Sequence, residues 1–203
     1  IDEVKREKEF TLRLLRSYAR FQGAQAPLTS IYADLKTNAE SSMTEETISS
    51  YITALKKLFV IEDAPAWNPN LRSKTAIRTS DTRYFVDPSI AIAALGVGPE
   101  KLIADLNTMG LLFETMCIRD LRVYSEALDG KVYHFRDKNG LECDAVTHLR
   151  DGRYGLVEIK LGGQRLIDEG AKTLHTLSGK IDTGKMMPPS FMMVLTGTGA
   201  YAY

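Results

Sequence analysis

The sequence is poor in cysteine, the residue whose disulfides stabilise small secreted domains. It has two cysteines, Cys117 and Cys143, which have apolar neighbours on an expected helix and an expected strand. This usage excludes a disulfide framework, argues against a cysteine-based zinc site and suits a reducing cytoplasm. No run approaches the ~18 apolar residues of a membrane span, and the charged start IDEVKREKEF is no signal peptide. We therefore expect a cytoplasmic protein without a membrane partner.

An excess of charge of either sign is also missing. The 26 Lys and Arg residues balance 26 Asp and Glu residues, so a surface for nucleic acid has to be a local patch. The 203 residues, 44% of them hydrophobic, suffice for one large or two small folded domains. Because the chain opens on Ile1 and leads directly into a helical pattern, we expect a piece excised from a longer protein.

The first half of the chain has the pattern of three helices and a two-stranded ribbon. Apolar spacing predicts helices at about 7–21 and 29–36, and a third that starts behind the N-cap Thr44 with an apolar stripe from Ile48 to Phe59. Strands are expected at 60–67 and 76–86. This order predicts a winged-helix-like domain over 1–87. A helix that opens on Pro88 connects it, over 88–98, to a second domain.

The second domain, 99–203, has an α/β rhythm. We expect a long helical region from Pro99 to about Leu128, kinked near Gly110. Three strands follow at 131–137, 141–149 and 154–161, with a hairpin turn at Asn139 and Gly140. A helix at about 165–177 and a buried strand at 191–195 complete a mixed central sheet. The inward side chains of the long helix are expected to be Leu112, Phe113, Met116, Leu121 and Tyr124. The fold class is therefore α/β (α+β).

The strand YGLVEIKLGG carries charges where a buried strand is expected. Glu158 and Lys160 share one face with Leu156, and Val157 and Ile159 lie on the other. An edge strand with one wet face explains this pair simply. A functional pair explains it as well, because charges at a sheet surface are costly to keep without a use.

Turn geometry decides whether Asp144 lies beside this pair. With a two-residue loop before the third strand, Asp144 pairs with Ile159 and lies on the wrong face. With a three-residue loop that ends on Gly152, Asp144 lies opposite Glu158, and such a loop is a type I turn followed by a left-handed glycine. The local sequence therefore allows both carboxylates, and Glu142 with them, on one face.

In order and spacing, Glu114, Asp144, Glu158 and Lys160 resemble the PD-(D/E)XK nuclease superfamily. That restriction-endonuclease-like α/β core carries a helical Glu, a strand Asp and a Glu-x-Lys on the next strand. The resemblance implies that Glu114, Asp144 and Glu158 hold Mg²⁺ or Mn²⁺ and that Lys160 orients or activates the attacking water. Phosphodiester hydrolysis needs such a hard cation and a positioned nucleophile. The Pro of the superfamily motif is missing, since Cys143 precedes Asp144.

A closer resemblance covers nearly all of residues 10–200. The stretches LLRSYAR, LTSIYADL, RYFVDPSIAIAALG, GLLFE, HFRDKNGLECDAV and GLVEIKLG resemble the C-terminal region of a group of prokaryotic AAA-type ATP-binding proteins. In these proteins an ATPase module precedes the winged helix, and a domain of unknown function with the nuclease-like fold follows it. The resemblance implies that an N-terminal ATPase module is a partner. The chain itself has no GxxxxGK(S/T) stretch, so we expect no ATP binding through a Walker motif.

Basic residues mark a candidate DNA surface. By analogy the third helix is a recognition helix, with Lys56 and Lys57 on its polar face. A modest basic patch in the ribbon is formed by Arg72, Lys74, Arg78 and Arg83. Two glutamates in the first turn of that helix oppose phosphate binding. Packing of the helix against the ATPase module is the alternative, and a scatter of basic residues is usually only a solvated surface.

Three hypotheses follow for the function. The first is a Mg²⁺-dependent phosphodiesterase that acts on or binds DNA as a module of the ATPase, where His134, Arg136 or Gln164 can also line the site. The second is a non-catalytic regulatory module that holds DNA or a protein with a relict nuclease fold. The third is an ion-pair cluster without metal. Metal binding separates the first from the third, and cleavage separates the first from the second.

Overall fold

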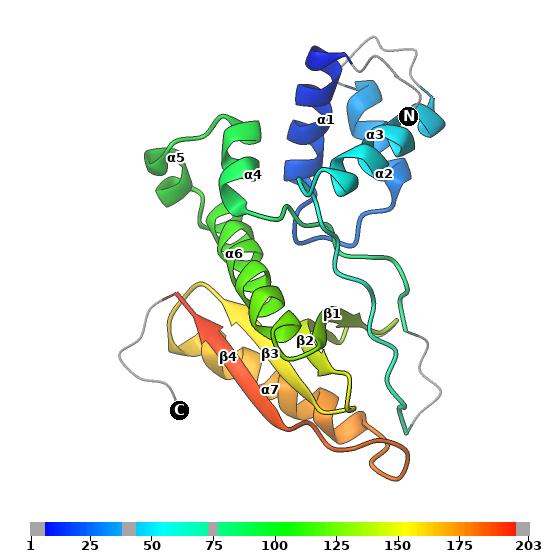
Figure 1. Ribbon diagram of the computed structural model, residues 1–203. Coiled ribbons are helices and arrows are strands. Elements are labelled where there is room, and N and C mark those ends of the chain that lie inside the picture. Colours follow the sequence, from blue (N-terminus) through cyan, green and yellow to red (C-terminus); the bar gives the residue numbers. More distant parts are fainter. Residues whose placement is uncertain (1–6, 38–43, 73–76, 198–203) are drawn as a thin grey trace.

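A computed structural model describes residues 7–37, 44–72 and 77–197. Within these residues the chain has seven helices and one four-stranded mixed sheet, so the structure is of the mixed α/β kind. A helical N-terminal part lies above a C-terminal part that contains the sheet (Figure 1). The elements in chain order are α1 (Lys8–Arg20), α2 (Leu28–Thr37), α3 (Glu45–Lys57), α4 (Pro88–Leu95), α5 (Pro99–Ala104), α6 (Leu106–Glu126), β1 (Gly130–Arg136), β2 (Glu142–Leu149), β3 (Tyr154–Lys160), α7 (Gln164–Lys180) and β4 (Phe191–Thr196).

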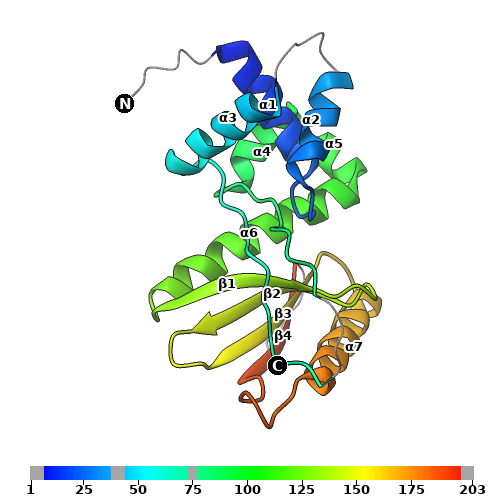
Figure 2. The same ribbon diagram turned by 90° about the vertical axis from the view of Figure 1, so that its right-hand side faces the viewer.

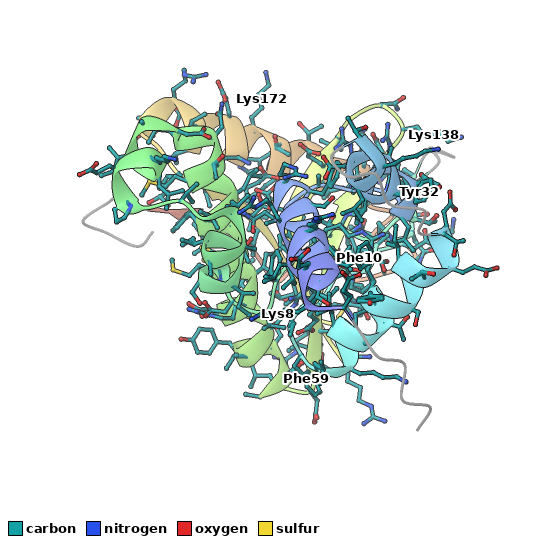
Figure 3. All side chains as sticks on the ribbon, turned by 90° about the horizontal axis from the view of Figure 1, so that it is seen from above. Lys8, Phe10, Tyr32, Phe59, Lys138 and Lys172 are labelled. Carbon is teal, nitrogen blue, oxygen red and sulfur yellow. The ribbon has the colours of Figure 1, made fainter. Side chains whose placement is uncertain are left out.

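The three N-terminal helices form as their apolar spacing predicts, and α1 to α4 share one core. Phe10 of α1 packs edge-on against Tyr51 of α3, with ring centroids 4.9 Å apart. Thr44 caps α3 by accepting a hydrogen bond from the Thr47 N–H. The predicted apolar stripe is wrong at its end, because α3 stops at Lys57. Phe59 then has a φ of 53° and is 78% exposed, and it lies at the periphery of the molecule seen from above (Figure 3).

The predicted strands at 60–67 and 76–86 are not formed as strands. The two runs, here called the strap (described at 60–72 and 77–87), pair with each other only at single bridges such as Ala64 with Thr82. Pro65 has no N–H to continue that ladder. Past it the strap pairs with β1 instead: the Trp67 N–H donates to the His134 carbonyl (2.7 Å), and the His134 N–H donates to the Pro65 carbonyl (3.0 Å). The winged-helix-like assignment stays a prediction.

Both runs of the strap pass from the helical part across the edge of the sheet (Figure 2). At their far end Leu71 forms a bridge with Ile181, next to the end of α7. Trp67 enters the core between the sheet and α7, and its ring lies 5.0 Å from that of Tyr154. Ala64 and Tyr84 enter the core on the other face of the sheet. The strap therefore supplies side chains to the cores on both faces.

The connection between the two parts confirms one predicted boundary and corrects another. The helix α4 begins at Pro88 as expected, behind the cap Asp87, and ends at the left-handed Gly96. The expected kink near Gly110 is wrong, since Gly110 lies inside α6. The break falls at Asp105, whose carboxylate accepts from the Thr108 N–H (3.2 Å) and so starts a new helix.

Two inward positions predicted for α6 are also wrong. Met116 and Tyr124 are exposed, Tyr124 by 68%, while Cys117 and Ile118 are buried against the sheet. Both cysteines of the chain are buried and free, as their apolar neighbours predict. Within the described residues, no helix has the length and apolarity needed to cross a membrane.

The sheet has the order β1-β2-β3-β4, antiparallel except for the parallel pair β3 and β4. The helix α6 covers one face and α7 the other (Figure 1). β3 is an interior strand, so its interpretation as an edge strand with one wet face is wrong. The edge strands are β1 and β4. The expectation that β4 is buried is wrong as well, since Phe191 and Met192 are exposed.

Candidate functional site

Asp144 lies where the paired part of β2 and β3 ends. The turn before β3 is the three-residue loop 150–152: the Leu149 N–H donates to the Arg153 carbonyl (2.8 Å), and Gly152 has a φ of 90°. This register pairs Ala145 with Val157, so Asp144 is the next residue along and comes beside Glu158. Its carboxylate accepts from the Ile159 N–H (Oδ2, 2.7 Å), and the backbone of β3 thereby fixes its position.

Lys160 joins two carboxylates. Its Nζ lies 3.0 Å from Asp144 Oδ2 and 2.6 Å from Glu158 Oε2. Burial alone lowers the pKa of Lys160, but the charges of Asp144 and Glu158 and their hydrogen bonds outweigh it, and the pKa lies well above its usual value. Lys160 is therefore an ammonium at neutral pH and the counterion of both acids.

Glu158 is a buried carboxylate with one free oxygen. Its side chain is 3% exposed, and Oε1 has no hydrogen-bond partner. The helix α7 comes close because Gly170 has no side chain: a Cβ there would lie 3.3 Å from Glu158 Cβ. Burial, and then the charge of Asp144, raise the pKa of Glu158 to about 7, against the opposing charge of Lys160. This carboxyl can change its protonation state near neutral pH.

Glu114 reaches the site from α6 and is held by the strap. The Tyr84 hydroxyl donates a hydrogen bond to Glu114 Oε1. Burial, and then the charge of Asp144, raise the pKa of Glu114 to about 8, while the hydrogen bond from Tyr84 lowers it. A Cβ on Gly23 would lie 3.5 Å from Glu114 Oε1, so the loop after α1 also covers this carboxyl. The helical part therefore encloses the third predicted acid.

A polar cleft of about 40 Å³ opens beside Glu114 and Asp144. Its walls come from β1, β2, the strap and the loop after α1. Two of its polar atoms, Gln25 Oε1 and Arg136 Nε, are buried without a hydrogen-bond partner. Of the additional residues suggested by the sequence, His134 and Arg136 line this cleft. Gln164 does not approach it, because its amide donates to Asp168 on α7 (2.8 Å).

The structure thus brings Asp144, Glu158 and Lys160 into direct contact and places Glu114 close enough for its charge to act on theirs. Within the described ranges, no three His, Cys, Asp or Glu side chains stand in an arrangement that holds a metal ion. Tyr84 was not suggested by the sequence. Its contact with Glu114 joins residues that are 30 positions apart, and no local pattern signals it.

The predicted DNA-binding residues that the structure describes lie on α3 and on the strap, where Arg83 of the basic patch is buried. Lys56 pairs with Asp63 (2.7 Å) at the end of α3, and Lys57 is an exposed neighbour. Arg72 lies at the other end of the strap, where its N–H donates to the Lys180 carbonyl (2.9 Å). Arg78 lies beside β1, where its N–H donates to the Arg136 carbonyl (2.8 Å). Lys74 lies outside the described residues.

Two family models match the chain. Residues 2–101 match a domain of unknown function, DUF8612, and residues 109–201 match a second domain of unknown function, DUF4143. The second match contains all four residues of the candidate site. No curated protein and no solved structure matches the chain.

Proposed function

We propose that the chain is the C-terminal module of an AAA-type ATPase and carries a metal-dependent phosphodiesterase site that acts on or binds DNA. The observation that carries this proposal is the pair of carboxylates, Asp144 and Glu158, joined at Lys160 on neighbouring strands. Asp144 on β2 and Glu158 with Lys160 on the next strand, β3, follow one another in the order that the resemblance to the nuclease-like superfamily implies. The fourth residue, Glu114, comes from the helix before the strands.

The donor set fits a hard divalent cation. Magnesium and manganese prefer oxygen ligands, and they often take one or two carboxylates and keep several waters. Glu158 Oε1 is a buried oxygen that has no partner, and an unsatisfied carboxylate oxygen in such a place calls for a bound group. Asp144 and Glu158 would hold the ion. Glu114, the third acid that the resemblance implies, would have to move closer, because in the described residues the three acids do not stand in an arrangement that holds a metal ion. When bound, the ion supplies charge neutralisation at the phosphoryl oxygens.

The protein's own residues divide the remaining work. Because its pKa is raised, Lys160 stays protonated and orients the attacking water and the phosphate oxygens by donating hydrogen bonds; it does not take up the proton. Without a metal ion the pKa of Glu158 is about 7; a bound cation would favour its ionised form, so Glu158 would act as a ligand of the ion. The Ile159 N–H fixes Asp144, so its orientation is set before any substrate binds.

The ATPase context rests on the resemblance of the chain to the C-terminal regions of AAA-type proteins. In such proteins the ATPase module would precede α1 and be the direct partner. A regulatory module without catalysis is the second candidate function. It is favoured by the ammonium of Lys160, which already serves as the cation between the two acids.

Titration calorimetry of Mg²⁺ and Mn²⁺ tests the proposal. We expect wild type to bind, and Asp144→Asn to bind ~10-fold or more weakly, because one carboxylate oxygen donor is replaced. Asp168→Asn, an exposed acid on α7, is the matched control and should bind as wild type does. The same proteins are then incubated with plasmid and single-stranded DNA.

Nicking that is lost with metal affinity in Asp144→Asn supports a metal-dependent nuclease. Metal binding without cleavage by wild type favours the regulatory module. Absence of metal binding in wild type overturns the catalytic proposal.

A further inference from the structure

The polar cleft beside Glu114 and Asp144 contains two groups that the fold leaves unsatisfied. Arg136 Nε is a hydrogen-bond donor and Gln25 Oε1 an acceptor, and both are buried without a partner. Leaving a buried polar atom without a hydrogen-bond partner costs free energy, and native proteins keep few such atoms. Two in one cleft, next to two candidate catalytic acids, indicate a binding function for the cleft.

Arg136 keeps one N–H of its guanidinium, that of Nε, without a hydrogen-bond partner in the protein. Its Nη1 pairs with Glu142 Oε2 (3.0 Å), and its backbone carbonyl accepts from the Arg78 N–H of the strap (2.8 Å). The side chain is 35% exposed, so it connects the cleft with solvent. Guanidinium groups bind phosphate through such planar N–H donors.

His134 fixes the orientation of the Gln25 side chain, because each ring nitrogen of His134 has a set role as hydrogen-bond donor or acceptor. His134 Nε2 lies 2.9 Å from the Ser80 carbonyl, to which it can only donate. Burial lowers the pKa of His134, so the ring is neutral and carries its one proton on Nε2. Nδ1 therefore accepts from the Gln25 amide (3.1 Å). The Gln25 oxygen is left as an acceptor in the cleft.

We propose that this cleft binds one phosphate group of a nucleic-acid strand, the group that flanks the reacting phosphate, with the phosphate oxygens on Arg136 and an adjoining N–H or O–H of the same nucleic acid on Gln25. The volume of about 40 Å³ has room for about three water molecules, which suits one phosphate group. The proposal rests on the proposed function and gives it a substrate contact on β1. Through Gln25, the helical part of the protein also contacts the nucleic-acid strand.

The test is the affinity of the chain for a fluorescein-labelled single-stranded oligonucleotide, measured by fluorescence anisotropy in Ca²⁺ and at several salt concentrations. We expect Arg136→Gln to lose ~10-fold or more in affinity, and the slope of log affinity against log salt to fall by about one unit, as for one lost phosphate contact. Arg136→Lys keeps the positive charge but loses the planar set of guanidinium N–H donors, so this variant should also bind the oligonucleotide more weakly than wild type.

Two controls separate binding from structure. Arg153→Gln removes an arginine that is 62% exposed on the turn before β3, and affinity should not change. Glu142→Gln removes the acid that competes for Arg136, and affinity should rise or stay the same. If the salt bridge between Arg136 and Glu142 had only a structural role, Arg136→Gln and Glu142→Gln would both break it and would lower the affinity equally.

The metal is measured separately, by Mn²⁺ titration without oligonucleotide. Arg136→Gln that binds Mn²⁺ as wild type does but loses oligonucleotide affinity supports the cleft. Oligonucleotide binding that depends on Arg136 in a protein without Mn²⁺ affinity also supports the cleft, while the phosphodiesterase proposal fails. If Arg136→Gln and Arg136→Lys both keep wild-type affinity and salt slope, or if wild type binds no oligonucleotide, the inference is overturned.

Discussion

Replacement of Glu158 by glutamine is expected to flatten the dependence of stability on pH. In the folded chain, burial and the charge of Asp144 raise the pKa of this carboxyl from 4.5 to about 7. Because the folded state holds the proton more tightly, Glu158 contributes full stability below its unfolded pKa, and this contribution is lost as the pH rises through about 7. Glutamine does not ionise in this range, so the stability of the variant does not fall with pH for this reason.

The size of the effect follows from the two pKa values. The pKa of Glu158 is 4.5 in the unfolded chain and about 7 in the folded chain. The difference lowers the free energy of unfolding by about 0.8 kcal/mol at about pH 5 and by about 3.3 kcal/mol at about pH 8, relative to low pH. Wild type should therefore lose about 2.5 kcal/mol more than Glu158→Gln over this interval. Loss of the contact with Lys160 shifts the whole curve of the variant but leaves its slope unchanged.

Urea denaturation at a series of pH values, followed by circular dichroism, measures this difference. Asp168→Asn is the control, because Asp168 is exposed on α7, away from Glu158, and its replacement should leave the slope as in wild type. Parallel curves of unfolding free energy against pH for wild type and Glu158→Gln would refute the reasoning. That result would mean that Glu158 is ionised, with an ordinary pKa, in the folded chain.

Two further predictions concern the strap. Trp67→Ala should lower the free energy of unfolding by about 3–5 kcal/mol, because this ring fills the core between the sheet and α7; urea denaturation followed by circular dichroism measures it, and Trp67→Phe should lose less. Asp63→Ala should cost about 3 kcal/mol or more, because it leaves Arg83, 10% exposed and 2.5 Å from Asp63, without its counterion. Thermal unfolding measures this loss, and a variant as stable as wild type would contradict the importance of the pair.

The strands β1 to β3 and the turn before β3 are the parts of the fold that the sequence predicts well. Alternation of apolar residues marks β1 to β3, and the glycine at 152 selects the loop that brings Asp144 beside Glu158. These signals are local, since they lie within a hairpin. The helix starts at Thr44 and Pro88 are predicted for the same reason, because capping residues act within one turn.

The parts that could not be predicted depend on distant partners. The strap looks like a ribbon because its residues favour strands, yet Ala66 pairs with His134 of β1, and no local pattern names that partner. Glu114 was found through the resemblance, but its contact with Tyr84 of the strap was not. Gly110 is tolerated inside α6 since a packed helix outweighs its weak propensity.

The course of the strap has a consequence for the order in which the protein is made. A ribosome releases Trp67 before β1 and β3, whose rings and backbone it later contacts. Until β1 has emerged with Phe135, this large apolar ring has no partner on the sheet, and an exposed aromatic side chain invites association with other chains. The N-terminal helices can pack early through their own core. The core around Trp67 of the strap, however, is completed only when Tyr154 has been made, some 90 residues later (67 to 154).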